Sequence, residues 1–317
     1  MVVLWGLMED TPLAVAYHGL KQLGVPVSFI DQRQILECTF SFSLSENISG
    51  EIIAPGVRLS LDEASVLYFR PYNFESLDVF SDINRNSREW ARAAQFEDAM
   101  MLWAETFPGL VVNRPSAMSS NSSKPYQLEL IRQHGFATPE TLITTDPESV
   151  LQFWRKHQRI IYKSISSSRS IVSQLSEPDL ATLEDVVCCP TQFQRFIDGM
   201  DYRVHVIDTK VYACKIVSPH DDYRYSTNTQ MEPAILDYEL EQRCVRLTRA
   251  LGLHFSGIDL RQSINGEWYC FEVNPSPGYT CFDQSGAISR ALVYFLARAI
   301  TKGEQGLKLV DIPKLVC

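Results

Sequence analysis

The stretch from Gly257 to Gly278 carries the residues with the clearest chemistry. Its sequence, GIDLRQSINGEWYCFEVNPSPG, predicts a β-hairpin, because Asn265-Gly266 suits the positive φ angles of a type I′ turn. With these two residues as the loop and one register throughout, Asp259 lies opposite Glu272, and Asn274 follows on the same face. Facing carboxylates destabilise a sheet, whereas Mg²⁺ prefers carboxylate and amide oxygens as ligands. The hairpin therefore predicts a metal site. The aromatic content of its second segment disfavours the alternative, a solvated face with ordinary surface acids.

A second polar group follows the strand predicted at Ile160–Lys163, which runs into a turn that can bind an anion. The turn has no glycine, and it combines Lys163 and Arg169 with backbone N–H groups and hydroxyls, the groups that cradle phosphate. Its serines are Ser164, Ser166, Ser167, Ser168 and Ser170. Lys124, just before a predicted helix N-terminus, can also reach phosphate at the positive end of the helix dipole. A Ser-rich surface loop is the alternative interpretation of this turn.

A third polar group begins at Gln194-Arg195-Phe196-Ile197 and bends into Asp201-Tyr202-Arg203. A carboxylate just past such a bend can accept hydrogen bonds from a ribose, although a hairpin with exposed charges fits the spacing equally well. Lys215 and Arg224 follow in the same predicted sheet and its loop, and are candidates for neutralising transferred charge. The histidines at 205, 220 and 254 are isolated, which favours surface or packing roles. No Ser-His-Asp or Cys-His pairing is supported.

These groups need elements that position them, and the sequence predicts three lobes. Residues 1–115 predict an α/β lobe that opens with strand, helix and strand, a right-handed parallel unit. A Ser-rich connector after Asn113 marks its end, and residues 116–190 and 191–317 form two further lobes. The predicted strands of the first lobe are 2–5, 27–30, 51–59 and 64–69, and its helices are 12–23 and 86–107.

The rest of the chain alternates short strands and helices, so the predicted fold class is α/β with α+β character. The segments 191–197, 202–207 and 211–217 are predicted to be strands of one antiparallel sheet. A strand at 171–175 is expected to pair with Ile160–Lys163. The predicted helices are 125–134, capped by Ser122 or Ser123, then 147–157, 238–251 and 289–300.

Composition narrows the class of protein. The chain has 317 residues, 45% hydrophobic and 21% charged, which is ordinary for a globular protein with a sizeable core. Its net charge of −9 argues against non-specific nucleic-acid binding. Eight cysteines without CxxC spacing indicate reduced thiols, and neither a membrane span nor a signal peptide is evident. We therefore expect a cytoplasmic protein without nucleic-acid or membrane partners.

The order of the polar residues along the chain resembles the ATP-grasp superfamily. That order is Lys124, Lys163, QRFI, Asp201, Asp259, Glu272 and Asn274. The resemblance covers residues 116–290, and EVNPSPG is its most specific part. The segments GIDLR…WYCFEVNPSPG and DYRVHV are most similar to ligases that add glutamate to a ribosomal protein or cyclise microviridin-type peptides. D-alanine–D-alanine ligase shares the spacing more distantly. The resemblance implies two α/β subdomains that grip ATP, preceded by an N-terminal α/β substrate lobe.

The resemblance also implies roles for single residues. ATP would be held through its phosphates, adenine and ribose by Lys124, Lys163, Ser168, Arg169, Gln194, Arg195, Phe196, Ile197, Asp201 and Lys215. Two magnesium ions, for which manganese can substitute, would be bound by Asp259, Glu272 and Asn274. Arg224 would contact the γ-phosphate, and the Gly278 N–H would face the tetrahedral intermediate. Apart from the resemblance, we predict that Arg203 and Arg70 bind a substrate carboxylate.

The implied reaction is phosphorylation of a carboxylate by ATP, followed by attack of an amine on the acyl phosphate. The sequence leaves the substrate open among amino acids, peptides and proteins, and leaves homo-oligomer formation open too. Two departures from the family stand out. The loop after Lys163 lacks glycine, and Arg195 replaces an acidic residue that relatives often carry. Two alternatives therefore stand beside the ligase: an ATP-binding regulatory protein without turnover, and an ATP-grasp kinase that forms no amide.

Overall fold

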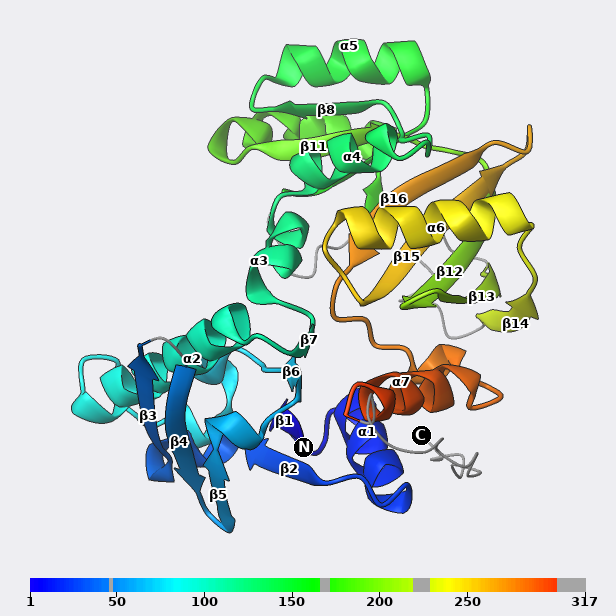
Figure 1. Cartoon of the computed structure of the whole chain (residues 1–317). Coiled ribbons are helices and arrows are strands. Elements are labelled where there is room, and N and C mark those ends of the chain that lie inside the picture. Colours follow the sequence, from blue (N-terminus) through cyan, green and yellow to red (C-terminus); the bar gives the residue numbers. More distant parts are fainter. Residues whose placement is uncertain (46–47, 166–171, 219–228, 301–317) are drawn as a thin grey trace.

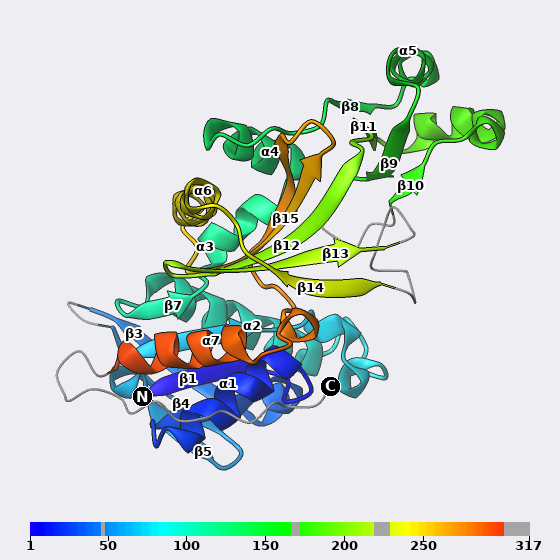
Figure 2. The same cartoon turned by 90° about the vertical axis from the view of Figure 1, so that its right-hand side faces the viewer.

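Four β-sheets and the helices that cover them make up the described part of the chain (Figure 1). The computed structural model describes residues 1–45, 48–165, 172–218 and 229–300. A small sheet, a large sheet and an N-terminal region follow one another as three tiers, and the two views of Figures 1 and 2 agree on this arrangement. Among the described residues, no helix is both long and apolar enough to cross a membrane.

The N-terminal sheet is parallel, in the order β2-β1-β6-β7, which confirms the predicted parallel unit. Its strands are β1 (Val2–Gly6), β2 (Val27–Asp31), β6 (Val66–Arg70) and β7 (Leu110–Val112). Both faces are buried, so β1 and β6 are continuous apolar runs. Val3 and Trp5 face α2 (Arg88–Thr106), while Val2 and Leu4 face α1 (Thr11–Gln22).

The last helix, α7 (Ala287–Arg298), returns to this N-terminal sheet. Its Ile288, Leu292 and Leu296 join the same apolar cluster as α1, and the two helices lie side by side in both views (Figure 2). The C-terminal end of the described chain is therefore part of the N-terminal core.

The strand predicted at 51–59 is wrong, because that segment is a hairpin. β4 (Ile48–Ala54) and β5 (Val57–Ser60) pair antiparallel and flank Pro55-Gly56, where Gly56 has φ +73°. Glycine adopts this left-handed conformation without steric cost, so the chain reverses there. β3 (Thr39–Leu44) adds a third strand on the other side of β4.

The small sheet has the order β10-β9-β11-β8 and is antiparallel throughout. Its strands are β8 (Thr141–Thr144), β9 (Ile160–Ser164), β10 (Ser173–Gln174) and β11 (Thr191–Arg195). One face carries Phe193 and packs against α5 (Pro147–His157) and the 3₁₀ segment η6 (Glu177–Cys188). The prediction that 191–197 shares a sheet with 202–207 and 211–217 is therefore wrong, because β11 pairs with β8 and β9. The segments 202–207 and 211–217 do pair antiparallel, as predicted. The chain leaves the small sheet after Arg195, whereas the predicted boundary between the second and third lobes lies after residue 190.

The large sheet has the order β14-β13-β12-β15-β16. Its strands are β12 (Gly199–Ile207), β13 (Lys210–Val217), β14 (Gln230–Ala234), β15 (Phe255–Ser263) and β16 (Trp268–Asn274). Its apolar face, with Val204 and Ile258, packs against α6 (Tyr238–Ala250) and α4 (Lys124–Gln133). The short helix α3 (Pro115–Met118) precedes α4. The other face is left to the polar residues of the site.

Helix ends follow the local sequence. Side chains of Asp10, Ser87, Asp146 and Asp237 accept hydrogen bonds from the first turns of α1, α2, α5 and α6. Ser123 is the residue before α4, as predicted, but its side chain makes no capping bond. The predicted helices differ from the observed ones by no more than two residues at either end.

Glu97 on α2 is expected to make stability depend on pH. Burial, followed by the charges of Asp98 and Glu75, raises its pKa from 4.5 to about 7. Below pH 4.5 the group is neutral in both states, and above pH 7 the folded protein must hold a charge that burial disfavours. Glu97→Gln should therefore raise the melting temperature above pH 7 and change it little below pH 4.5. Thermal unfolding of both proteins across this range tests it, and an equal effect at both ends would contradict it.

Candidate active site

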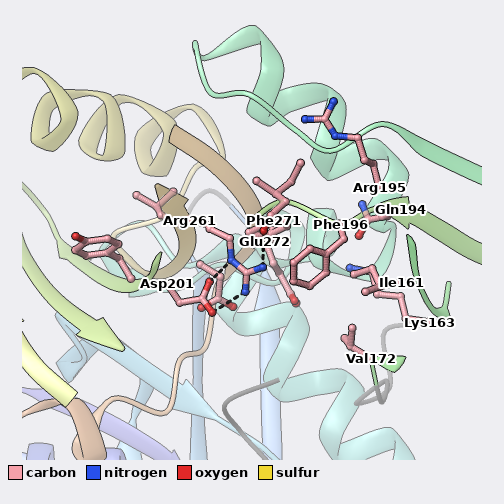
Figure 3. A pocket seen from close by; sticks show the side chains of 14 residues that line it. Ile161, Lys163, Val172, Gln194, Arg195, Phe196, Asp201, Arg261, Phe271 and Glu272 are labelled. Atoms are coloured by element: carbon pink, nitrogen blue, oxygen red, sulfur yellow. Dashed lines mark hydrogen bonds and ion pairs between the residues drawn. The ribbon is translucent and has the colours of Figure 1, made fainter. Parts of the chain in front are cut away.

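A pocket of about 120 Å³ opens between the small and the large sheet (Figure 3). Its walls come from β9, β11, β12, β15 and β16, and from the segment that joins β11 to β12. It brings together eight of the predicted site residues: Lys163, Gln194, Arg195, Phe196, Ile197, Asp201, Asp259 and Glu272. The other lining residues, which the sequence did not single out, are Ile161, Val172, Tyr202, Leu260, Arg261 and Phe271. Residues from both sheets thus meet in one place.

The hairpin places Asp259 opposite Glu272, as predicted, but not through the predicted turn. Ser263 N donates to Glu267 O at 2.9 Å, so three residues form the loop, with Gly266 at φ +82°. A bulge between Asp259 and Leu260 then leaves Phe271 without a partner and restores the register at the acids. The uniform register is therefore wrong for the outer half of the hairpin.

Arg203 holds the Asp259 carboxylate. It lies directly across from Asp259 on β12, and its Nη1 is 2.6 Å from Asp259 Oδ1. Since only 5% of Arg203 is exposed, its position favours orienting this carboxylate. The third predicted ligand, Asn274, follows Glu272 by two residues, and its Oδ1 accepts from Ser276 N at 2.8 Å. In the part of the chain that the structure describes, no three His, Cys, Asp or Glu residues are grouped so that they could hold a metal ion. The predicted ligand set differs from such a group, because it consists of two carboxylates and the amide of Asn274.

The segment between the sheets supplies hydrogen-bonding groups. Gln194 is almost fully buried; its Nε2 donates to Thr141 Oγ1 at 3.0 Å, and its Oε1 has no partner among the described residues. Asp201 forms a two-pronged ion pair with Arg261, at 2.6 and 2.7 Å, drawn as dashes in Figure 3. Arg261 Nη1 also donates to Ile197 O at 2.9 Å. Arg261 therefore connects Asp201, which is predicted to bind ribose, to Ile197 in the segment that is predicted to bind adenine.

Lys163 and Gln194 share the pocket-facing side of the small sheet with Gln192. Strand pairing places Gln192 directly across from Lys163, while Phe193 points to the opposite, apolar face. Gln192 is 0% exposed, and neither atom of its amide has a hydrogen-bond partner in the described structure. Alternation along β11 was the signal that could have shown it.

Some predicted residues lie elsewhere. Lys124 is the first residue of α4 and does not line the pocket. Lys215 pairs with Tyr202 and Glu232, which places it on the α6 face of the large sheet, opposite to Arg203. Gly278 has open space where a side chain would project. Ser168, Arg169 and Arg224 lie outside the described residues.

Arg70 connects the N-terminal region to the loop after β16. Its Nε is 2.6 Å from Asp10 Oδ2, and its Nη1 donates to Ser276 Oγ at 2.9 Å and to Pro277 O at 3.3 Å. Only 9% of Arg70 is exposed. These contacts occupy the guanidinium, so they argue against the predicted role in binding a substrate carboxylate.

Two sheets that enclose a pocket, with paired acids on one sheet and a lysine on the other, define the ATP-grasp fold. The chain belongs to the RimK-like ATP-grasp family, whose domain profile matches residues 121–294. This confirms the predicted family and fold.

Individual relatives agree with this assignment. A probable α-L-glutamate ligase of Rhodopirellula baltica is 24% identical over 217 residues, which cover 62% of this chain and 53% of the relative. The α-aminoadipate–LysW ligase LysX of Sulfurisphaera tokodaii is 25% identical over 187 residues, which cover 53% and 64%. The chain thus spans between about half and two thirds of the length of these curated relatives.

Solved structures match over nearly the whole chain. The ATP-grasp ligase PsnB complexed with a minimal precursor has a TM-score of 0.78 and 26% identity, covering 94% of this chain and 98% of that one. The macrocyclase MdnC of Microcystis aeruginosa, bound with its precursor peptide MdnA, has a TM-score of 0.81 at 20% identity, covering 94% and 99%. The second likeness concerns the fold alone.

Proposed function

We propose that this chain is an ATP-dependent carboxylate–amine ligase that forms an amide bond through an acyl phosphate and releases ADP and phosphate. The observation that carries the proposal is the pairing of Asp259 with Glu272 at the pocket wall, facing Lys163 on the other sheet. Acids on one wall and a cation on the other are the parts that phosphoryl transfer needs.

The pocket suits a nucleotide. The buried Gln194 Oε1 is an acceptor without a partner among the described residues, which fits the amino group of adenine. We propose that Asp201, which is paired with Arg261, binds the ribose hydroxyls and that Lys163 binds the phosphates; both side chains line the pocket. Two further cations, Arg169 and Arg224, are proposed to join the phosphates on family likeness alone.

The metal set suits Mg²⁺. Asp259 and Glu272 would hold it through carboxylate oxygens and Asn274 through its amide oxygen, the ligand types that Mg²⁺ takes. When bound, Mg²⁺ neutralises phosphate charge and orients the transferred group. We propose two ions, with Mn²⁺ able to substitute. Arg203 keeps Asp259 oriented for this purpose.

The substrate we propose is a peptide or protein. PsnB and MdnC were solved with precursor peptides, and PsnB also with Mg and ADP. We infer a cytoplasmic enzyme without nucleic-acid partners, in line with the net charge of −9.

ADP release in the presence of Mg²⁺-ATP and candidate carboxylate–amine pairs tests the proposal. We expect release to require both substrates, and mass spectrometry to detect an added amide. Nucleotide binding without ADP release in any mixture would instead indicate a regulatory protein. A stable phosphorylated product without amide would indicate a kinase.

A further inference from the structure

A second pocket of about 250 Å³ lies at the other end of the polar face of the large sheet. It is bordered by β12, β13 and the end of β14, and by the segment that leads from η8 (Thr280–Phe282) into α7. The residues that matter here are His205, Tyr212, Glu241, Phe282 and Asp283. The role proposed above for ATP and metal uses none of them.

The pocket adjoins the metal set through the strand register. His205 pairs with Gly257, and Gly257 pairs with Asn274, so the three residues cross the sheet in one line. Neighbouring strands are about 4.8 Å apart, which places the His205 and Asn274 backbones about 10 Å from each other. Gly257 adds no side chain between them, and a Cβ there would collide with the Arg203 guanidinium. The Arg203 guanidinium therefore lies against Gly257, between the metal set and His205.

His205 is a buried polar side chain without a partner. It is 0% exposed, and neither ring nitrogen has a hydrogen-bond partner among the described residues. Burial, followed by the charge of Arg203, holds the pKa of His205 well below its ordinary value. The neutral ring offers one donor and one acceptor. Leaving both unpaired in the interior is costly, so such a group calls for an explanation.

The Phe282 ring packs against both His205 and Arg203. It lies 5.4 Å from the His205 ring and 5.8 Å from Arg203 Cζ. Phe282 belongs to the three-residue 3₁₀ segment η8, which follows β16 in the chain. Both His205 and Phe282 line the pocket, so a ligand that shifts the Phe282 ring would gain access to the His205 ring nitrogens.

The charges of the pocket wall favour an amine over a carboxylate. Asp283 and Glu241 line it, and none of its described lining residues is Lys or Arg. Arg203, the cation next to Phe282, forms an ion pair with Asp259. The cation Arg290 lies near this wall but does not line the pocket. The pKa of Tyr212 on the wall is raised, first by burial, and then more by the charge of Asp283 than Arg290 lowers it. The negative charge therefore predominates at Tyr212. A positively charged or hydrogen-bonding amine is attracted to such a wall, and a carboxylate is repelled.

We propose that this pocket binds the amine acceptor, a primary amine such as a lysine side chain, and that His205 hydrogen-bonds its nitrogen beside the metal set. The proposal rests on the ligase function proposed above and names its acceptor class. The donor carboxylate would then arrive on the far side of Arg203, next to Asp259. His205 is a binding residue in this scheme.

The test is a titration of the histidine ring nitrogens of the full chain by ¹H–¹⁵N NMR, which needs no turnover. The probe is Nα-acetyl-lysinamide, and the matched probe is Nα-acetyl-glutamate. His205→Phe assigns the signal, and this change keeps an aromatic ring among Phe255, Tyr279 and Phe282. His254, which is exposed and lies beside Phe295, is the internal control.

We expect the amine probe to shift the His205 signals, the glutamate probe to leave them in place, and His254 to respond to neither. No shift with the amine, or an equal shift with glutamate, would overturn the proposal. In turnover, His205→Phe should raise KM for the amine about tenfold or more, equivalent to about 1.4 kcal/mol. Hydroxamate formation from donor, ATP and hydroxylamine should persist, because hydroxylamine does not need the pocket. A wild type inactive in both assays would contradict the ligase function, while the titration would still decide the pocket.

Discussion

Replacing Glu272 with Gln is expected to reduce Mg²⁺-dependent ADP release by at least about a hundredfold, the loss typical of removing one group that stabilises developing charge. Glu272 lies opposite Asp259, and both carboxylates line the pocket between the sheets. Glutamine keeps the size of the side chain but lacks the charge that Mg²⁺ needs. Steady-state ADP release at saturating ATP measures the effect.

In the absence of metal, Glu272→Gln is expected to stabilise the fold, although it lowers the activity. Two like charges on facing strands destabilise a sheet, and the ion pair that Arg203 forms with Asp259 offsets this repulsion in part. Glu272→Gln should therefore raise the melting temperature slightly without Mg²⁺ and abolish the further rise that Mg²⁺-ATP gives to the wild type. Glu267→Gln, at the exposed turn of the same hairpin, is the matched control and should behave as wild type. If both variants keep full activity, the hairpin acids are not metal ligands.

The sequence predicted the pairing of these acids correctly from a turn that was wrong. The loop has three residues rather than two, which shifts the register by one, and the bulge at Phe271 shifts it back. Alternation of residue types identifies which side chains share a face, but a bulge leaves no clear mark in one sequence. The prediction held because the acids lie beyond both irregularities.

Long-range pairing is what the sequence did not reveal. β11 looked continuous with β12, yet it pairs with β8 and β9. The segment from Phe196 to Asp198 carries the chain from one sheet to the other, and local propensity does not encode such a change. Arg261 and Gln192 were missed for the same reason, since their roles depend on which strands are neighbours. Local features, such as the caps and ends of the helices, were predicted well.

Arg70→Met is expected to destabilise the fold by about 3–5 kcal/mol, the usual consequence of leaving one member of a buried ion pair alone. Asp10 is 7% exposed, and its two carboxylate oxygens accept from Arg70 at 2.6 and 3.3 Å. Methionine fills much of the space of arginine but donates no hydrogen bond. Denaturant unfolding followed by circular dichroism measures the change in free energy.

Arg33 offers a matched control, because its Nη2 also lies 2.6 Å from a carboxylate oxygen, on Asp31, but its side chain is 41% exposed. Arg33→Met should cost less than about 1 kcal/mol, since water screens an exposed pair. Adding Asp10→Asn to Arg70→Met should recover part of the loss, because the unpaired charge is then gone. Arg70→Met should also lower the rate of ATP turnover, because Ser276 and Pro277, which follow Asn274, lose their hydrogen bonds to Arg70. A loss of stability as small as that of Arg33→Met would mean that the Asp10–Arg70 pair does not hold the N-terminal region against the loop at Ser276 and Pro277.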